Sequence, residues 1–454
     1  MEVPVEKNKE YVVDIMDNGF SGEGIAKINN YTIFIPNAIK GEKIKILIVK
    51  VLKTHAFGKI LEIIDKSQYR VESDCTTYKR CGGCSMRHIE YLETLKIKKN
   101  TVQNLVNKTL KNKIIVEKTL GMNNPYNYRN KAQYPIGVNK DGQAVIGVYA
   151  NRTHEVIPIK DCYIQDERTE KIAKYITKYI TENDISIYNE NTGKGLIRHI
   201  VTKIGKSTGE IMCIIVINGN EIPNEKKLVE DLIVKFPKIK TIVKNVNKKN
   251  TNVILGNKNI VLYGKGYIKD KLGNLEFKIS PLSFYQVNPI QAENLYNIGV
   301  KYANITKEDI VFDLYSGIGT ISLFMARYAK KVYGIEIVED AVNDAKENAK
   351  MNKINNVEFI AGDVEKVLDT LINKKKIIPN IVMVDPPRKG LDNNTIKNIK
   401  SIKPKKVIYI SCNPATLVRD LSYLEEEYEI CKIKPVDMFP FTSHVECVAV
   451  MYIK

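Results

Sequence analysis

The stretch DIVFDLYSGIGTISLFMARYAKKVYGIEI, residues 309–337, decides the fold of the C-terminal part of this chain. An apolar run ends in a turn with Gly317 and Gly319, a helix-length segment follows, and a second apolar run closes the stretch. The alternation continues through VEFIAG, NIVMVD and KVIYISC, which begin at residues 357, 380 and 406. Apolar strands that alternate with helices are typical of a doubly wound parallel sheet. We therefore predict a Rossmann-like α/β domain over residues 284–454.

The glycine turn indicates a site for a nucleoside-bearing cofactor. Gly317 and Gly319 let the backbone approach a ligand at the start of a helix, where N–H groups are free. Glu336 ends the second strand, where a carboxylate can accept both hydroxyls of a ribose. Position 322 is Ser, so the third glycine of the dinucleotide fingerprint is missing. The shortened loop favours S-adenosylmethionine over NAD; the alternative is a structural Glu336 that caps the next helix.

Polar side chains also follow the later strands of this alternation. Asp363 follows the third strand, where it could contact an adenine, and Asp385 follows the fourth, before two prolines that stiffen the loop. Cys412 closes the fifth strand in YISCNPATL, residues 409–417. The carboxyl ends of parallel strands share one edge of a sheet, so we expect these groups to lie near the cofactor.

Cys412 is either a small buried residue or a nucleophile. Carbon 5 of uracil accepts a methyl group only poorly, but a thiolate added to carbon 6 makes an enolate that reacts at carbon 5. A base must then remove the hydrogen of carbon 5 so that the cysteine can leave. The C-terminal run FPFTSHVECV supplies Glu446 as the predicted base and His444 as an alternative.

The basic residues of the chain are concentrated in its middle third. The formal net charge is +18, and basic residues exceed acidic ones by 1 in residues 1–63, by 16 in 64–283 and by 1 in 284–454. A basic surface attracts a polyanion by releasing its counterions, so this distribution favours nucleic-acid binding over a merely solvated face. The run YNYRNKAQYPI, residues 126–136, either lines an RNA channel or packs its tyrosines inside a strand.

Three domains are expected from these patterns and from the length of 454 residues. Residues 1–63 contain short strands separated by glycine turns, which predicts a small barrel of the oligonucleotide-binding kind. Residues 64–283 mix strands with helices near 86–110, 163–181 and 224–235, which predicts an α+β domain. The N-terminus is polar and no long apolar run is present, so we expect a cytoplasmic protein with no membrane contact. No obligate protein partner is evident.

The motifs SPLSFYQVN, DLYSGIGT, GIEI, VDPPRKG, ISCNPATLVRDL and FPFTSHVE, in this order, resemble the RNA uracil-5-methyltransferase family. The resemblance implies that Cys412 is the nucleophile and Glu446 the base. It also implies that S-adenosylmethionine is contacted by Gln286, Tyr315, Glu336 and Asp385. Asp363 and Thr320 are further candidates for the cofactor shell. The N-terminal run GEGIAKINNYTIFIPNAIKGEKIKI is similar to a TRAM domain, an RNA-binding barrel.

Three cysteines on one loop, with a fourth downstream, are typical of a metal site in a cytoplasmic protein. They are Cys75, Cys81, Cys84 and Cys162. Zinc and an iron–sulfur cluster can both use four thiolates, and the resemblance implies a 4Fe–4S cluster. Methyl transfer needs no redox step, so we predict a structural role for the cluster. Cys213, Cys431 and Cys447 lie in apolar strands and are predicted core residues.

Family members with both the barrel and the four cysteines act on large-subunit ribosomal RNA, so the resemblance implies 23S ribosomal RNA as the substrate. Transfer RNA is the alternative. A non-catalytic RNA-binding protein would need neither Cys412 nor Glu446, and cytosine enzymes use cysteine within different motifs.

Overall fold

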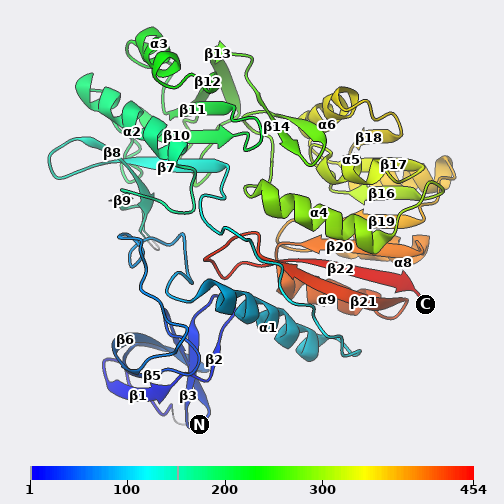
Figure 1. The fold of residues 1–454 in the computed structure, drawn as a ribbon, viewed down its shortest axis with the longest axis horizontal. Helices are drawn as coiled ribbons and strands as arrows, with labels where there is room; N and C mark the ends of the chain where they lie inside the picture. Colours follow the sequence, from blue (N-terminus) through cyan, green and yellow to red (C-terminus); the bar gives the residue numbers. More distant parts are fainter. Residues whose placement is uncertain (1–2, 151–152) are drawn as a thin grey trace.

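The computed structural model describes residues 3–150 and 153–454, and these form three units (Figure 1). The N-terminal barrel, the central sheet and the C-terminal sheet follow one another along the chain, from blue through green to red. Helix α1 (Tyr91–Thr109) runs between the barrel and the C-terminal sheet. Its residues Val102 and Val106 are fully buried in a cluster that includes residues of the C-terminal sheet.

The N-terminal unit is the expected small barrel. Its strands are ordered β1-β5-β6-β4-β3-β2, and alternate residues such as Ile33, Ile35, Ile44 and Ile46 fill its interior. This period of two is the signature of a strand with one buried face. The strands are β1 (Glu10–Asp14), β2 (Asp17–Asn18), β3 (Gly24–Ile28), β4 (Tyr31–Ile35), β5 (Lys43–Val51) and β6 (His55–Asp65).

The central unit is a seven-stranded sheet in the order β13-β12-β11-β10-β7-β8-β9. One face packs against helices α2 (Glu167–Glu182) and α3 (Glu225–Lys235), and residues of the other face belong to the cluster of the C-terminal unit. Both faces are covered, which explains why β11 reads as a continuous apolar run and why every residue of β10, the polar ones included, is buried. The strands are β7 (Lys131–Val138), β8 (Ala144–Tyr149), β9 (Val156–Pro158), β10 (Ile197–Ile204), β11 (Ile211–Ile217), β12 (Ile239–Val246) and β13 (Lys258–Gly264).

The C-terminal unit confirms the predicted doubly wound sheet, in the order β18-β17-β16-β19-β20-β22-β21. The first five strands in this order are parallel, and β22 enters antiparallel between β20 and β21. The strands are β16 (Ile310–Leu314), β17 (Lys331–Glu336), β18 (Val357–Ala361), β19 (Ile381–Val384), β20 (Lys406–Ser411), β21 (Tyr428–Val436) and β22 (Glu446–Ile453). The helices are α4 (Pro289–Ala303), α5 (Thr320–Ala326), α6 (Glu339–Met351), α7 (Val364–Asp369), the π-helical turn Thr370–Lys374, α8 (Asn393–Ile402) and α9 (Pro414–Leu424).

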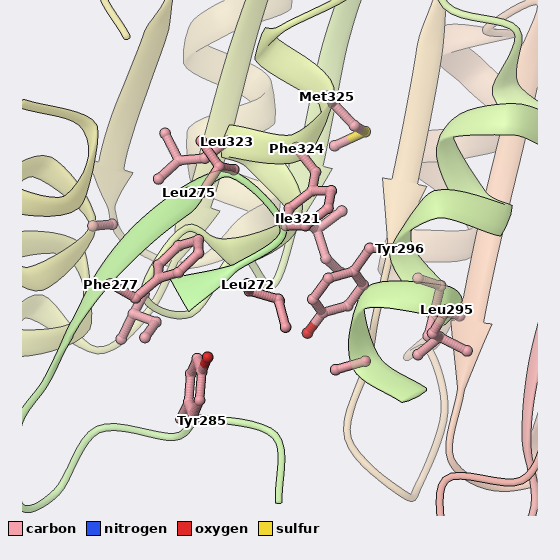
Figure 2. Close-up of a cluster of buried hydrophobic side chains, with 14 of the residues drawn as sticks. Leu272, Leu275, Phe277, Tyr285, Leu295, Tyr296, Ile321, Leu323, Phe324 and Met325 are labelled. Atoms are coloured by element: carbon pink, nitrogen blue, oxygen red, sulfur yellow. The ribbon is translucent and has the colours of Figure 1, made fainter. Parts of the chain in front are cut away.

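A hairpin joins the central unit to the C-terminal one. Its strands β14 (Ile268–Leu272) and β15 (Leu275–Ile279) place Leu272, Leu275 and Phe277 in the same buried cluster as Tyr296 of α4 and Phe324 of α5 (Figure 2). The segment after the hairpin carries Gln286, so this packing holds it beside the C-terminal sheet.

Two of the three predicted core cysteines are fully buried, namely Cys213 and Cys447. The prediction is wrong for Cys431, which is exposed. Cys431 lies two positions after the exposed Glu429 and shares its outward face, whereas Tyr428 and Ile430 point inward. Within the described residues, no helix is long and apolar enough to cross a membrane.

Candidate active site

A cavity of about 1090 Å³ lies at the carboxyl edge of the parallel strands. Its wall combines segments that are far apart in the sequence: the 284–286 segment, the glycine turn, the ends of β17, β19 and β20, and the start of β22. The predicted site residues on this wall are Gln286, Tyr315, Glu336, Asp363, Asp385, Cys412, His444 and Glu446. The structure therefore gathers all but one of the predicted cofactor and catalytic residues.

Cys412 and Glu446 are neighbours because β22 runs antiparallel to β20. Ser411 pairs with Cys447 at the end of the ladder between these strands, so one further step in this register sets Cys412 opposite Glu446. A parallel strand would bring only its carboxyl end to this edge, whereas β22 brings its first residue. The thiol and the carboxyl therefore meet at the wall of the same cavity.

The carboxyls of Glu446 and Asp385 are held partly protonated at neutral pH. Burial, and then the charge of Asp385, raises the pKa of Glu446 to about 8. Burial likewise raises the pKa of Asp385 to about 7. Two carboxyls that share an enclosed site resist ionising together, so the pair titrates as a unit.

Burial also raises the pKa of the Cys412 thiol, and the charges of Glu446 and Asp385 raise it further. Arg388 acts in the opposite direction and lowers it. Asn413 and Thr416 hold the loop with Arg388, since their side chains donate to its carbonyl at 3.1 and 3.3 Å. Arg388 was not predicted as a site residue, although it lies in the same motif, VDPPRKG, from which Asp385 was predicted.

The glycine turn has the backbone shape that its sequence predicts. Gly317 and Gly319 have φ values of 55° and 82°, a region that favours glycine. A Cβ on Gly319 would lie 2.5 Å from the ring of Phe359, whereas one on Gly317 would meet nothing within 4 Å. Gly317 therefore faces the open cavity, and Gly319 lets helix α5 pack closely.

Tyr315 also has a positive φ, of 72°, which is unusual for a residue with a side chain. Its hydroxyl lies 3.3 Å from the hydroxyl of Thr395 in α8. This contact holds the ring at the cavity wall despite the cost of the backbone conformation.

Glu336 bridges the glycine turn and helix α6. One carboxylate oxygen accepts the N–H of Gly317 at 3.0 Å, and the other accepts the N–H of Val338 at 2.9 Å. The structural alternative for this residue is thus correct in part. Each carboxylate oxygen has a second lone pair, so both can still accept ribose hydroxyls from the cavity.

Asp363 caps helix α7, because one of its oxygens accepts the N–H of Glu365 at 3.0 Å. Its other oxygen has no protein donor among the described residues, and the side chain lines the cavity. Gln286 is fixed through its backbone, whose carbonyl accepts the side-chain N–H of Asn130 at 2.9 Å. Its side chain is left to line the cavity.

Thr320 is the predicted residue that does not line the cavity. It begins helix α5, and its hydroxyl donates to that of Tyr296 at 3.5 Å. Its place in the cofactor shell stays a prediction. Ser322, which replaces the third fingerprint glycine, donates to the buried Asp313 at 2.5 Å and so closes the floor of the turn.

His444 also lies at the cavity wall and is exposed. The protein atoms around the exposed ring still exclude part of its water, and this, with the charges of Arg388 and Lys98, lowers its pKa. The imidazole is therefore neutral at physiological pH and able to accept a proton, which keeps it an alternative base.

The four clustered cysteines are half-buried and near one another. Burial, and then the charge of Cys162, raises the pKa of Cys84 to about 12, with smaller effects of Cys81 and Cys75. The N–H of Gly83 donates to the sulfur of Cys81 at 3.3 Å. Within residues 3–150 and 153–454, however, no three His, Cys, Asp or Glu side chains are arranged to hold a metal ion.

In the run 126–136, two of the tyrosines pack inside the protein, as the alternative to an RNA channel predicts. Tyr128 and Tyr134 are buried, and the hydroxyl of Tyr134 lies 2.8 Å from that of Thr169. Tyr126 is 40% exposed, so it is the tyrosine of this run still open to a ligand.

Comparison with known proteins agrees with this geometry. The profile of the tRNA (uracil-5-)-methyltransferase family matches residues 225–454, and that of the TRAM domain matches residues 4–61. The chain is 46% identical to an uncharacterized RNA methyltransferase of Clostridium acetobutylicum, over 99% of this chain and 98% of that one. It is 44% identical to one from Halalkalibacterium halodurans, over 100% and 99% of the two chains.

Among solved structures, the tRNA (uracil-54, C5)-methyltransferase of Pyrococcus abyssi, in complex with S-adenosyl-L-homocysteine, has a TM-score of 0.78 and 25% identity. The match covers 97% of this chain and 100% of that one. The present chain belongs to the tRNA (uracil-5-)-methyltransferase family. It is an RNA methyltransferase that uses S-adenosylmethionine and acts on an RNA substrate.

The charges and hydrogen-bond acceptors that line the cavity fit S-adenosylmethionine. Its acidic groups outnumber its basic ones, and no cation of the described residues lowers the pKa of Asp385 or Glu446. A sulfonium cation would supply that missing charge. The free lone pairs of Glu336 suit a ribose, and the open side of Gly317 leaves room for it.

Proposed function

We propose that the enzyme methylates carbon 5 of a uridine in 23S ribosomal RNA through a covalent bond between Cys412 and carbon 6 of the base. The observation that carries this proposal is the register that sets Cys412 opposite Glu446, at a cavity shared with the glycine turn and Glu336. We assign the barrel (1–63) and the basic middle domain (64–283) to holding the RNA, and residues 284–454 to the reaction.

The site has a group for each proton and bond that the reaction requires. The Cys412 thiolate bonds to carbon 6, and the electrons of the carbon 5–carbon 6 double bond move into an enolate. S-adenosylmethionine supplies the methyl group that carbon 5 receives. The Glu446 carboxylate then takes the hydrogen of carbon 5 as a proton, the double bond re-forms, and the Cys412 thiolate leaves. The pKa of Cys412 is raised by burial and by the charges of Glu446 and Asp385, and the charge of Arg388 offsets part of this rise and so favours the thiolate.

The remaining cofactor contacts are part of the same proposal. Gln286, Tyr315, Glu336 and Asp385 hold S-adenosylmethionine, with Asp363 and Thr320 at the edge of its site. We expect Asp363→Ala to weaken cofactor binding less than Glu336→Ala.

Two substitutions test the covalent step. Glu446→Gln should still bond to the base and methylate it but fail to release it, so a protein–RNA adduct should migrate slowly in a denaturing gel. Cys412→Ala should form no adduct and no product, while S-adenosylmethionine binding measured by calorimetry stays as in the native enzyme. A Glu446→Gln enzyme that turns over at the native rate would refute its role as base, and would direct attention to His444.

Ribosomal RNA is proposed because the barrel and the four cysteines occur together in this chain. A specific observation favours a second candidate, because a solved transfer-RNA enzyme matches 97% of this chain. Mass-spectrometric mapping of 5-methyluridine in cells with and without the gene separates them. Loss of the mark from 23S RNA alone supports the first candidate, and loss from transfer RNA alone supports the second.

We also propose that Cys75, Cys81, Cys84 and Cys162 hold a 4Fe–4S cluster of structural role. Four half-buried thiols support this assignment, three of which (Cys81, Cys84 and Cys162) have a pKa raised by burial and by neighbouring cysteines, as does a backbone N–H directed at Cys81. Binding would draw the four sulfur atoms together and fasten the 75–84 loop to the segment around Cys162. Anaerobically purified protein should be brown and contain about four iron and four sulfide per chain. A colourless protein with stoichiometric zinc would refute the cluster.

A further inference from the structure

An aromatic patch on the outside of the barrel has no role in the fold described above. It consists of Phe34 in β4 and His55 and Phe57 in β6. We infer that this patch is a stacking site for unpaired bases of the RNA substrate, separate from the catalytic cavity. The inference rests on the proposed function only in requiring that the substrate be RNA.

The strand alternation puts these three rings on the outer face. Ile33 and Ile35 on either side of Phe34 are fully buried, as is Ala56 between His55 and Phe57. The three aromatic residues themselves are half-exposed. Neither phenylalanine belongs to the hydrophobic cluster that fills the barrel.

The rings form one continuous group because β4 and β6 are parallel neighbours, with Thr32 paired to His55 and Phe34 to Phe57. The centroid of the Phe34 ring lies 5.3 Å from that of His55 and 6.0 Å from that of Phe57. The His55 and Phe57 centroids are 5.2 Å apart. The hydroxyl of Thr54 lies 3.0 Å from the imidazole of His55 and helps to hold this ring in place.

Lysines flank the patch on both sides. Lys27 of β3 pairs with Thr32, and Lys50 of β5 pairs with Phe57. Both lysines are exposed, and neither has an acidic partner among the described residues. Aromatic rings bordered by free cations are the usual surface for single-stranded nucleic acid, because bases stack on the rings and phosphates meet the cations.

The charge of the patch argues for RNA over a second protein or a membrane. A protein partner would be expected to bury a larger and less charged apolar area. A lipid surface calls for many more basic residues than these two. The occupant is therefore an unpaired segment of RNA, bound through its bases with little dependence on their sequence.

The test compares two RNA probes with the full-length protein. One is a hairpin, and the other is the same hairpin with a single-stranded extension of about ten adenosines, within the range of site sizes known for such barrels. The native protein should bind the extended probe more tightly. In Phe34→Ala/Phe57→Ala, affinity for the extended probe should fall about tenfold or more, while affinity for the plain hairpin stays unchanged.

Salt dependence distinguishes stacking from charge. Replacing the rings should leave the slope of log affinity against log salt unchanged, whereas Lys27→Ala/Lys50→Ala should reduce it by about 1.4. Tyr423→Ala, which removes a ring 48% exposed on α9, is the matched control and should change neither probe. Phe57→Leu removes the ring but keeps an apolar side chain, so it serves as a second test variant if Phe34→Ala/Phe57→Ala does not fold.

Equal losses on both probes, or unchanged binding to the extended probe in Phe34→Ala/Phe57→Ala, would overturn the inference. Binding is measured without methyl transfer. If the proposed 23S target or the covalent step proves wrong, the binding result is therefore unaffected. Likewise, a failure of the stacking inference leaves the proposed reaction untouched.

Discussion

The loop before Glu446, the proposed base, is anchored by a buried ion pair, and breaking this pair should loosen the site. The Nζ of Lys98 in α1 contacts Asp437, and the side chains are 1% and 0% exposed. Lys98 also donates to the carbonyl of Phe439 at 3.2 Å, and Tyr91 donates to Asp437 at 2.8 Å. Residues 437–445 lead from this anchor into Glu446.

Lys98→Met keeps the length of the side chain but leaves the Asp437 carboxylate buried with Tyr91 as its side-chain donor. Removing one partner of a buried pair costs about 3–5 kcal/mol. Lys96→Met, on the same helix, removes the pair between the exposed Lys96 and Glu93, whose atoms lie 2.7 Å apart, and should leave the stability almost unchanged.

Hydrogen exchange of peptides from the 437–445 loop measures the difference directly. A loss of about 3–5 kcal/mol in local stability corresponds to exchange that is faster by about two to three and a half orders of magnitude. Methylation should slow in Lys98→Met, because the start of β22 then fluctuates. If the loop in Lys98→Met exchanges as slowly as in Lys96→Met, the ion pair does not anchor it and the reasoning fails.

Three further outcomes follow from single sites. The proposed mechanism needs both the Glu446 carboxylate, whose pKa is about 8, and the Cys412 thiolate, whose pKa is also raised, so kcat/KM should rise steeply with pH up to about pH 8 and continue to rise, less steeply, above it; a flat profile from pH 6 to 9 would contradict this. Gly319→Ala sets a Cβ 2.5 Å from the Phe359 ring at positive φ, and should cost about 1–3 kcal/mol in thermal unfolding and weaken cofactor binding in dialysis. Cys447→Ser buries a hydroxyl and should cost about 1–3 kcal/mol, whereas the exposed Cys431→Ser should stay within about 0.5 kcal/mol in the same melt; equal melting temperatures would contradict the assigned burial.

The sequence predicts the elements of the C-terminal domain well because their signals are local. Apolar strands, the glycine turn and the polar residue that ends each strand lie within a few positions of one another. Glu336, Asp385 and Cys412 are therefore found as site residues from the ends of their strands alone. The period of two in the barrel likewise identifies its strands before their pairing is known.

The pairing of distant segments is what the sequence leaves open. Strand β12 has lysine and asparagine within IKTIVKNV, and its partners β11 and β13 are parallel and antiparallel to it, an arrangement that no local pattern shows. The contact of Lys98 with Asp437 joins residues 339 positions apart.

The insertion of β22 explains why the proposed base stands at the start of a strand rather than on a loop. In a purely parallel sheet, the edge with the cofactor receives only strand ends and the loops after them. An antiparallel strand reverses this, and Glu446 enters the cavity paired with Val436 of β21, while the next residue, Cys447, pairs with Ser411 of β20. This pairing holds the backbone on one side of Glu446, and the Lys98 anchor restrains the incoming loop on the other. The position of the base relative to Cys412 thus depends on strand register, which tolerates far less variation than a loop does.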